Sequence, residues 1–464
     1  MNKSLISEPL GLFGWKHLEP VILAALASES PMLLIGKHGS AKSFLLERLA
    51  ESLNMNFRCY NASLINYDDL VGIPIPINNN TSLSYISNPN SIWDAEVVFI
   101  DEINRTKPEL QNKLFPIIYD KRVQGTNLTK LKYRWAAMNP PSSDDDEEEL
   151  SYIGAMPLDP ALADRFPFII EVPDWNSLND EEKKNMLIDN YLGRHEFPID
   201  IHELIAKTQQ KFAVLVKNSG DSSSKYVITL MELLKNSFGY ISARRATMFD
   251  QSLLYIYAAL MVLGEYFDEK PSFQDAAFIH IQNTLPNLAN EKIDKALLMN
   301  ICQQALRLSN LEDSIDKGIL LISDPVERLK SLINSRKTVD IETINNIIPD
   351  SLSQLDTYRR RTMALFTYMA FRSNREIHAA VMETLANEVR PVMTTNTHKS
   401  MEHLRIKKIA DKVEAVLSQA NLSNKNKNYL SNLLHSFLPN DYGSEDDVVR
   451  LYAFYMKVFE ELDL

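Results

Sequence analysis

The stretch MLLIGKHGSAKS, residues 32–43, joins a short apolar run to a loop that is rich in small residues. The run Met32–Ile35 has the length and composition of a buried strand, and residues 44–53 after the loop have those of a helix. A strand, a glycine-containing loop and a helix in this order are typical of phosphate-binding loops. The loop consists of Gly36, Lys37, His38, Gly39, Ser40, Ala41, Lys42 and Ser43.

These loop residues supply the groups that a nucleotide phosphate requires. Glycine lets the backbone wrap around phosphate oxygens, and N–H groups at the start of the following helix carry partial positive charge. We predict that Lys42 contacts the β- and γ-phosphates of ATP and that Ser43 binds Mg²⁺ through its hydroxyl. Alanine tolerates left-handed backbone poorly, so at Ala41, where glycine is usual, we expect right-handed backbone. A chance turn of small residues is the alternative.

Four further apolar runs accompany this loop in the first part of the chain. Each is short and bounded by polar or turn residues, as buried parallel strands are. Together with the helical stretches between them, they predict an α/β core over residues 1–173, with a parallel sheet covered by helices. The runs are Phe57–Asn61, Val97–Asp101, Tyr133–Met138 and residues 168–172.

Polar side chains follow two of these predicted strands. Carboxylates at the end of a buried strand are costly unless they bind a cation. We therefore predict that Asp101 holds the hydration shell of Mg²⁺ and that Glu102 polarises the attacking water. Asn139, after the run Tyr133–Met138, can orient the same water. The alternatives are a strand that ends in a surface turn and an asparagine that starts a turn before Pro140.

The rest of the chain is predicted to be helical. Residues 174–310 include a long apolar helix around residues 246–263, and residues 311–464 disperse charged residues among Leu, Ile and Met. Breaks are expected at Ser309-Asn310, Pro349-Asp350, residues 394–396 and Pro439-Asn440. The acidic run SSDDDEEE, residues 142–149, is predicted to be a solvated loop, and contact with a basic partner is the alternative.

Composition narrows the class of protein. The net charge of -12 argues against a dedicated nucleic-acid binder. The chain has 2 cysteines, Cys59 and Cys302, which are far apart, so neither a disulfide scaffold nor a zinc site is expected and a reducing cytoplasm fits best. The most apolar long stretch, residues 253–263, is about half the length of a membrane span. We therefore expect a soluble, cytoplasmic protein without a membrane segment.

At this point the sequence resembles the AAA+ ATPases, and more narrowly the MoxR group. The matching stretches are GKHGSAKS, FIDEINRTKPELQNKLFPII at residues 99–118, AAMNPP at residues 136–141 and LDPALADRF at residues 158–166. Residues 68–72 resemble the entry to an extra hairpin in that group. The resemblance covers residues 1–310 and implies that residues 174–310 form a helical lid. It says nothing about residues 311–464.

The resemblance also implies roles for two arginines. Arg165 would be the arginine finger that reaches into the site of a neighbouring subunit. Residues 242–246 resemble the sensor-2 element, in which Arg244 would touch the phosphates, although Arg245 is one position away and stays open. The alternatives are an exposed Arg165 paired with Asp164 and two arginines on a solvated helix face.

The function implied is that of an ATP-hydrolysing ring subunit, with a hexamer expected. Such rings act as chaperones or remodellers that mature or activate partner proteins, here including partners with a von Willebrand A domain. One alternative is a nucleic-acid motor, for which the sequence offers Arg359-Arg360-Arg361 and Lys407-Lys408. Another is a nucleotide-dependent scaffold or switch, which would not need a complete hydrolytic set.

Overall fold

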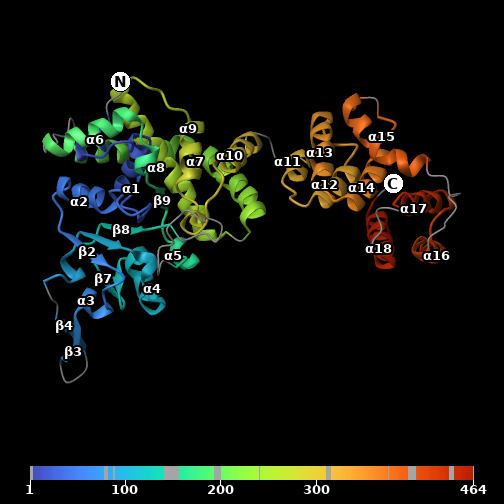
Figure 1. Cartoon of the computed structure of the whole chain (residues 1–464). Helices are drawn as coiled ribbons and strands as arrows, with labels where there is room; N and C mark the ends of the chain where they lie inside the picture. The colour runs from blue at the N-terminus through green and yellow to red at the C-terminus, as the bar shows by residue number, and fades with distance from the viewer. Residues whose placement is uncertain are drawn as a thin grey trace. The chain divides into compact units, whose positions relative to one another are not determined.

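The computed structural model describes residues 4–77, 82–86, 89–140, 156–192, 200–239, 241–309, 315–374, 376–394, 404–437 and 444–462. The chain divides into two compact units, residues 1–310 and 311–464 (Figure 1). The second unit begins at residue 311, where the sequence predicts the start of the C-terminal helical region. A further division of the first unit at residue 173 stays a prediction.

A five-stranded parallel sheet forms the centre of the first unit, as the sequence predicts. Its strand order is β2-β5-β8-β1-β9, so the strand before the phosphate loop lies between β8 and β9. Every pairing in the sheet is parallel, and the carboxyl ends of the strands therefore meet at one edge. The strands are β1 (Met32–Ile35), β2 (Phe57–Asn61), β5 (Val97–Asp101), β8 (Tyr133–Met138) and β9 (Phe168–Glu171).

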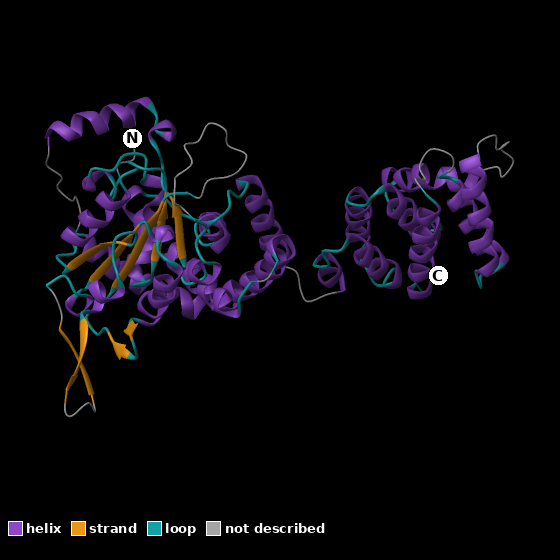
Figure 2. Ribbon diagram, turned by 60° about the horizontal axis from the view of Figure 1, so that its bottom comes forward, coloured by secondary structure: helices purple, strands orange, loops and turns teal. Residues whose placement is uncertain are grey.

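Helices flank this sheet, and Figure 2 shows its strands lying among them. The four residues of β1 and the six of β8 are all buried, which explains why these strands are apolar or aromatic except at Arg134, whose guanidinium donates to backbone carbonyls. The helices are α1 (Glu19–Ala27), α2 (Lys42–Ser52), α3 (Tyr67–Val71), α4 (Pro108–Phe115), α5 (Pro160–Ala163), α6 (Asp180–Leu192), α7 (Ile201–Phe238), α8 (Ala243–Phe267), α9 (Phe273–Gln282) and α10 (Lys295–Ser309).

Two small hairpins lie outside the central sheet. The strands β3 (Ile73–Ile77) and β4 (Ser82–Ile86) pair antiparallel directly after α3, where the resemblance implies an extra hairpin. Figure 2 shows this hairpin projecting from the rest of the first unit. The other hairpin pairs β6 (Arg122–Val123) with β7 (Thr126–Asn127). It follows α4 and the single π-helical turn Pro116–Asp120.

Helix α8 is the one described helix that is long and apolar enough to cross a membrane. The apolar stretch is therefore longer than residues 253–263 suggest by themselves. In the structure α8 packs against α1, α7 and α9, and its side chains from Leu253 to Val262 are largely buried. These contacts are those of a core helix, which explains the apolar composition without a membrane.

The second unit consists of helices around its own apolar core. One predicted break is wrong, because Pro349 lies inside α13 and does not end it. Ile344, Ile347 and Ile348 are buried in the core, and this packing holds the helix through the proline. The helices are α11 (Ile315–Leu320), α12 (Pro325–Asn334), α13 (Ile341–Ser353), α14 (Thr357–Phe371), α15 (Ala379–Thr394), α16 (Leu404–Gln419), α17 (Asn424–His435) and α18 (Glu445–Glu461).

Candidate nucleotide site

The lysine of the phosphate loop, residues 36–43, is held at the carboxyl edge of the sheet. Lys42 begins α2, and its side chain turns back so that Nζ donates to the carbonyls of Gly36 at 2.7 Å and Lys37 at 2.9 Å. Nζ also lies 3.3 Å from the side-chain oxygen of Asn139, at the end of β8. The loop and a neighbouring strand therefore converge on one ammonium group.

The surroundings of Lys42 change its proton affinity. The residue is 8% exposed, and burial lowers the pKa of its ammonium to about 8. The nearby carboxylates of Asp101 and Glu102 act in the opposite direction and favour the charged form. A phosphate would add further negative charge beside the ammonium and raise its pKa again.

The backbone at Ala41 differs from the prediction. Its φ of 60° and ψ of 21° are left-handed, where right-handed geometry was expected. The carbonyl of Ala41 already accepts a bond from the N–H of Leu45 at 3.0 Å, so the chain turns from loop to helix at this residue. Gly39 is also left-handed, with φ of 80°. The requirement that the loop carbonyls face Lys42 therefore outweighs the local preference of alanine, at a cost of about 1–2 kcal/mol.

Ser43 and Asp101 meet, as a shared magnesium site requires. The Ser43 hydroxyl donates to the Asp101 carboxylate across 3.2 Å. Mg²⁺ prefers oxygen ligands and in nucleotide sites takes one or two from the protein, with waters and phosphate oxygens completing its shell. In the described part of the chain, His, Cys, Asp and Glu form no group of three or more that could hold a metal by themselves. A hydroxyl beside a carboxylate at the phosphate loop fits this ion when a nucleotide supplies the remaining oxygens.

Glu102 lies directly after β5 in left-handed backbone, with φ of 54°. Two partners that were not predicted from the sequence hold its carboxylate. Asn61, the last residue of β2, lies 3.4 Å away, and Arg105 forms an ion pair at 3.2 Å. Asn61 is opposite Asp101 in the parallel register. A polar residue at the end of the strand next to β5 was therefore the sequence signal that could have predicted the contact with Glu102.

Asn139 is 6% exposed and belongs to the same cluster. Its side-chain oxygen faces Lys42, and its backbone carbonyl accepts a bond from the amide of the buried Asn104 at 3.1 Å. The structure therefore brings five predicted residues together, four through side-chain contacts and Glu102 through its position directly after Asp101. We name them the strand-end cluster: Lys42, Ser43, Asp101, Glu102 and Asn139.

Arg165 lies elsewhere, at the end of α5. Its guanidinium donates to the carbonyl of Ala161 and stacks over the ring of Phe115, 4.2 Å from the ring centre. Burial lowers the pKa of this guanidinium, and the positive charge of Arg244 adds to the effect. The contacts of Arg165 come from α4 and α5 and not from the phosphate loop.

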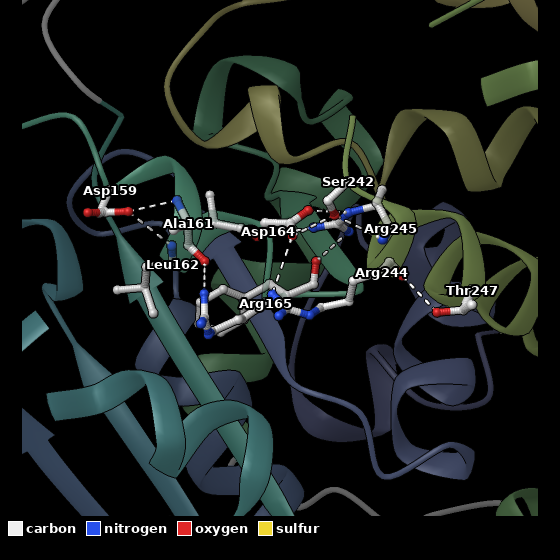
Figure 3. A network of polar contacts seen from close by, with 11 residues as sticks. Asp159, Ala161, Leu162, Asp164, Arg165, Ser242, Arg244, Arg245 and Thr247 are labelled. Atoms are coloured by element: carbon white, nitrogen blue, oxygen red, sulfur yellow. Dashed lines mark hydrogen bonds and ion pairs between the residues drawn. The ribbon is translucent and has the colours of Figure 1, made fainter. Parts of the chain in front are cut away.

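The structure distinguishes Arg244 from Arg245 (Figure 3). Arg245 is 0% exposed, pairs with Asp164 at 3.2 Å and donates to backbone carbonyls, so it has no surface to offer a phosphate. The side chain of Arg244 is 40% exposed, pairs with Asp164 at 3.7 Å and lies over the ring of Tyr119. Of the two candidates only Arg244 is accessible, and its role as a phosphate sensor stays a prediction.

Asp164, the alternative partner predicted for Arg165, forms its contacts with other residues. The Asp164 carboxylate accepts from the Ser242 hydroxyl at 2.9 Å and is paired with Arg244 and Arg245. We call Asp164, Arg165, Arg244 and Arg245 the arginine cluster. The acidic residues 142–149 lie outside the described residues.

A match to a known family agrees with this geometry. Residues 31–166 match the model of a family described as the AAA domain, dynein-related subfamily. The first unit thus contains a stretch similar to an AAA domain, and this similarity supports nucleotide binding at the phosphate loop. One matching solved structure is a protein from Cytophaga hutchinsonii, provisionally named an ATPase. It is 19% identical with a TM-score of 0.45, and the match covers 65% of this chain and 92% of that one. A search of curated proteins gives no match.

Proposed function

We propose that the chain binds ATP with Mg²⁺ and hydrolyses it as a subunit of a ring. The observation that supports this proposal best is the strand-end cluster, in which Lys42, Ser43 and Asp101 join a carboxylate and an amide suited to positioning water. A protein that only bound nucleotide would need the lysine and the hydroxyl but not Glu102 in this place.

The residues of the cluster have separate tasks in this proposal. Lys42 would hold the β- and γ-phosphates, and Ser43 and Asp101 would hold Mg²⁺, which would offset the charge of the phosphates. Glu102 accepts a proton from the attacking water, and Asn139 orients that water. Glu102 must first exchange its contacts with Asn61 and Arg105 for the water, so these two residues set how readily the base becomes available.

The position of the arginine cluster supports the proposed ring. Arg165 and the exposed Arg244 are close enough for each to influence the other, and their contacts lie outside the strand-end cluster. A cationic pair of this kind suits the phosphates of a nucleotide held by a neighbouring subunit. With the resemblance to the MoxR group, this supports a homo-hexamer that matures or activates partner proteins, including those with a von Willebrand A domain.

The structure weakens the case for a nucleic-acid motor. Arg360 donates twice to the carbonyl of Leu355, and Arg361 packs over the ring of Phe437. Arg359 is paired with Asp356 at 3.5 Å. Arg360 and Arg361 thus contribute to the packing of the second unit, whereas the side chain of Arg359 is 60% exposed. A patch for a nucleic-acid backbone requires several accessible cations, and this run offers one.

The test of the proposed function is ATP turnover per subunit as a function of protein concentration. We expect turnover to rise as subunits associate, because each site is completed by its neighbour. Glu102→Gln should retain ATP and lose about a hundredfold or more in rate, and Glu51→Gln, on an exposed face of α2, is the matched control. Binding without turnover above a Lys42→Ala blank would favour the nucleotide-dependent switch instead. Full turnover by Glu102→Gln would remove Glu102 from its role.

A further inference from the structure

The carboxylate of Asp164 connects the segment that carries Arg165 to the first turn of α8. One oxygen, Oδ1, accepts from Nε of Arg245 at 3.2 Å. The other, Oδ2, accepts from the hydroxyl of Ser242 at 2.9 Å and faces Arg244 at 3.7 Å. Ser242 is also the N-cap of α8, since its hydroxyl accepts from the N–H of Arg245 at 3.1 Å. A single carboxylate therefore contacts three residues at the beginning of one helix.

Arg245 strengthens this connection by bonding to the backbone on both sides of Arg165. Its Nη2 donates to the carbonyl of Ala163 at 3.2 Å, and its Nη1 donates to the carbonyl of Phe166 at 2.9 Å. A further bond from Nη1 to the carbonyl of Thr284, at 3.0 Å, ties the same guanidinium to the segment after α9. The backbone of Arg165 is thereby fixed to the helices that follow β9.

Asp164 lies beside both Arg165 and Arg244, although these two arginines are distant in sequence. Arg165 follows Asp164 directly, and Arg244 is paired with its carboxylate (Figure 3). Two guanidinium groups repel each other, so holding them close needs a negative charge between them or nearby. Asp164 supplies this charge at a side chain that is 17% exposed, where the attraction is screened less than at the surface.

We propose that Asp164 is a positioning residue that fixes Arg165 and Arg244 to the start of α8, so that both arginines move with this helix into the site of the neighbouring subunit. This inference rests on the proposed function, because it needs a site shared between subunits. The inference predicts that Asp164 acts in one direction across the contact between subunits. Asp164 serves the nucleotide of the neighbour and not the nucleotide bound by its own subunit.

The experiment mixes two kinds of subunit, each inactive by itself. Acceptor subunits carry Arg165→Ala and keep the strand-end cluster, and donor subunits carry Lys42→Ala and keep Arg165. The reference mixture should hydrolyse ATP at the acceptor sites that have a donor as neighbour. Adding Asp164→Asn to the donor should lower the turnover of the mixture by about tenfold to a hundredfold, the loss that a misplaced catalytic group brings. Adding it to the acceptor should leave the turnover within about twofold, since the acceptor's own Asp164 serves a different site.

Equal losses from the donor and the acceptor would show a general structural role and overturn the inference. An unchanged rate with the Asp164→Asn donor would also overturn the inference. In that case, turnover in the reference mixture would still support a site shared between subunits. No turnover in the reference mixture would contradict the shared site itself and the inference with it. If Asp164→Asn subunits do not fold, Ser242→Ala removes one bond to Asp164, and its smaller loss should again appear only in the donor.

Discussion

The strand-end cluster and the arginine cluster are both built from charged side chains, but they differ in how fully those charges are enclosed. Lys42 is 8% exposed and is surrounded by oxygen atoms of its own subunit. In the arginine cluster the innermost guanidinium, Arg245, is fully buried, while the side chain of Arg244 is 40% exposed. The first cluster can act on a ligand bound within its own subunit. The second has an internal anchor and an accessible cation, which suits a ligand held by another molecule.

This contrast predicts different outcomes for two adjacent arginines, and here we expect the largest effect. Arg245→Ala should lower the free energy of unfolding by about 3–5 kcal/mol, because it removes a fully buried guanidinium and leaves several backbone carbonyls and one oxygen of the partly buried Asp164 carboxylate without a partner. Arg244→Ala should cost no more than about 1 kcal/mol, the usual limit for an exposed pair, while ATP turnover falls. The free energy of unfolding of both variants is measured by urea titration, and their ATP turnover is measured in parallel. Similar losses of stability would remove the distinction between anchor and accessible cation.

The enclosed cluster is tested by its lysine. Lys42→Ala should weaken ATP binding by about a hundredfold or more, because it removes the charged donor that faces the phosphates. Lys130→Ala is a matched control, since Lys130 forms an exposed ion pair with Asp94 and its side chain is 61% exposed. Titration of each variant with a fluorescent ATP analogue compares them. Equal affinities would show that Lys42 does not hold the phosphates.

Burial of Lys42 also predicts a pH dependence of binding. Without nucleotide the pKa of its ammonium is about 8, and bound phosphate raises it. The charged form binds, so affinity should be nearly constant below about pH 7.5 and fall above pH 8, by about tenfold for each further unit. Lys42→Arg keeps its charge at all these pH values, and any binding it retains should not follow this curve. An affinity of the unaltered protein that is constant up to about pH 9.5 would contradict this prediction.

The smallest effect is expected at Ala41. Ala41→Gly removes the cost of left-handed backbone, partly offset by the greater freedom of glycine in the unfolded chain, and should stabilise the protein by up to about 1 kcal/mol. Ala50→Gly, in the right-handed part of α2, should destabilise it by about 1 kcal/mol. Thermal unfolding of the two variants gives the comparison. Destabilisation by Ala41→Gly would show that its backbone is not strained.

Much of the first cluster could be predicted because its residues follow strands of one parallel sheet. The spacing of apolar runs identifies the strands, and parallel pairing then brings the residues after β1, β5 and β8 to one edge. Asn61 and Arg105 were missed because contact with Glu102 depends on side-chain direction and on the left-handed turn after β5. The prediction of right-handed backbone at Ala41 was wrong because it considered only the local preference of alanine and not the contacts that override it.

The sequence by itself therefore determined the parallel sheet, the phosphate loop and the polar residues at the strand ends, since periodicity and motif spacing are local properties of the chain. Only the tertiary structure decided which of Arg244 and Arg245 is accessible, because burial depends on packing between α8 and the segment before β9. It also decided that Pro349 lies within a helix, since the apolar core of the second unit offsets the lost backbone bond. Asp164 is positioned by contacts with residues that are 78 and 81 positions away in the sequence, a separation that no motif encodes.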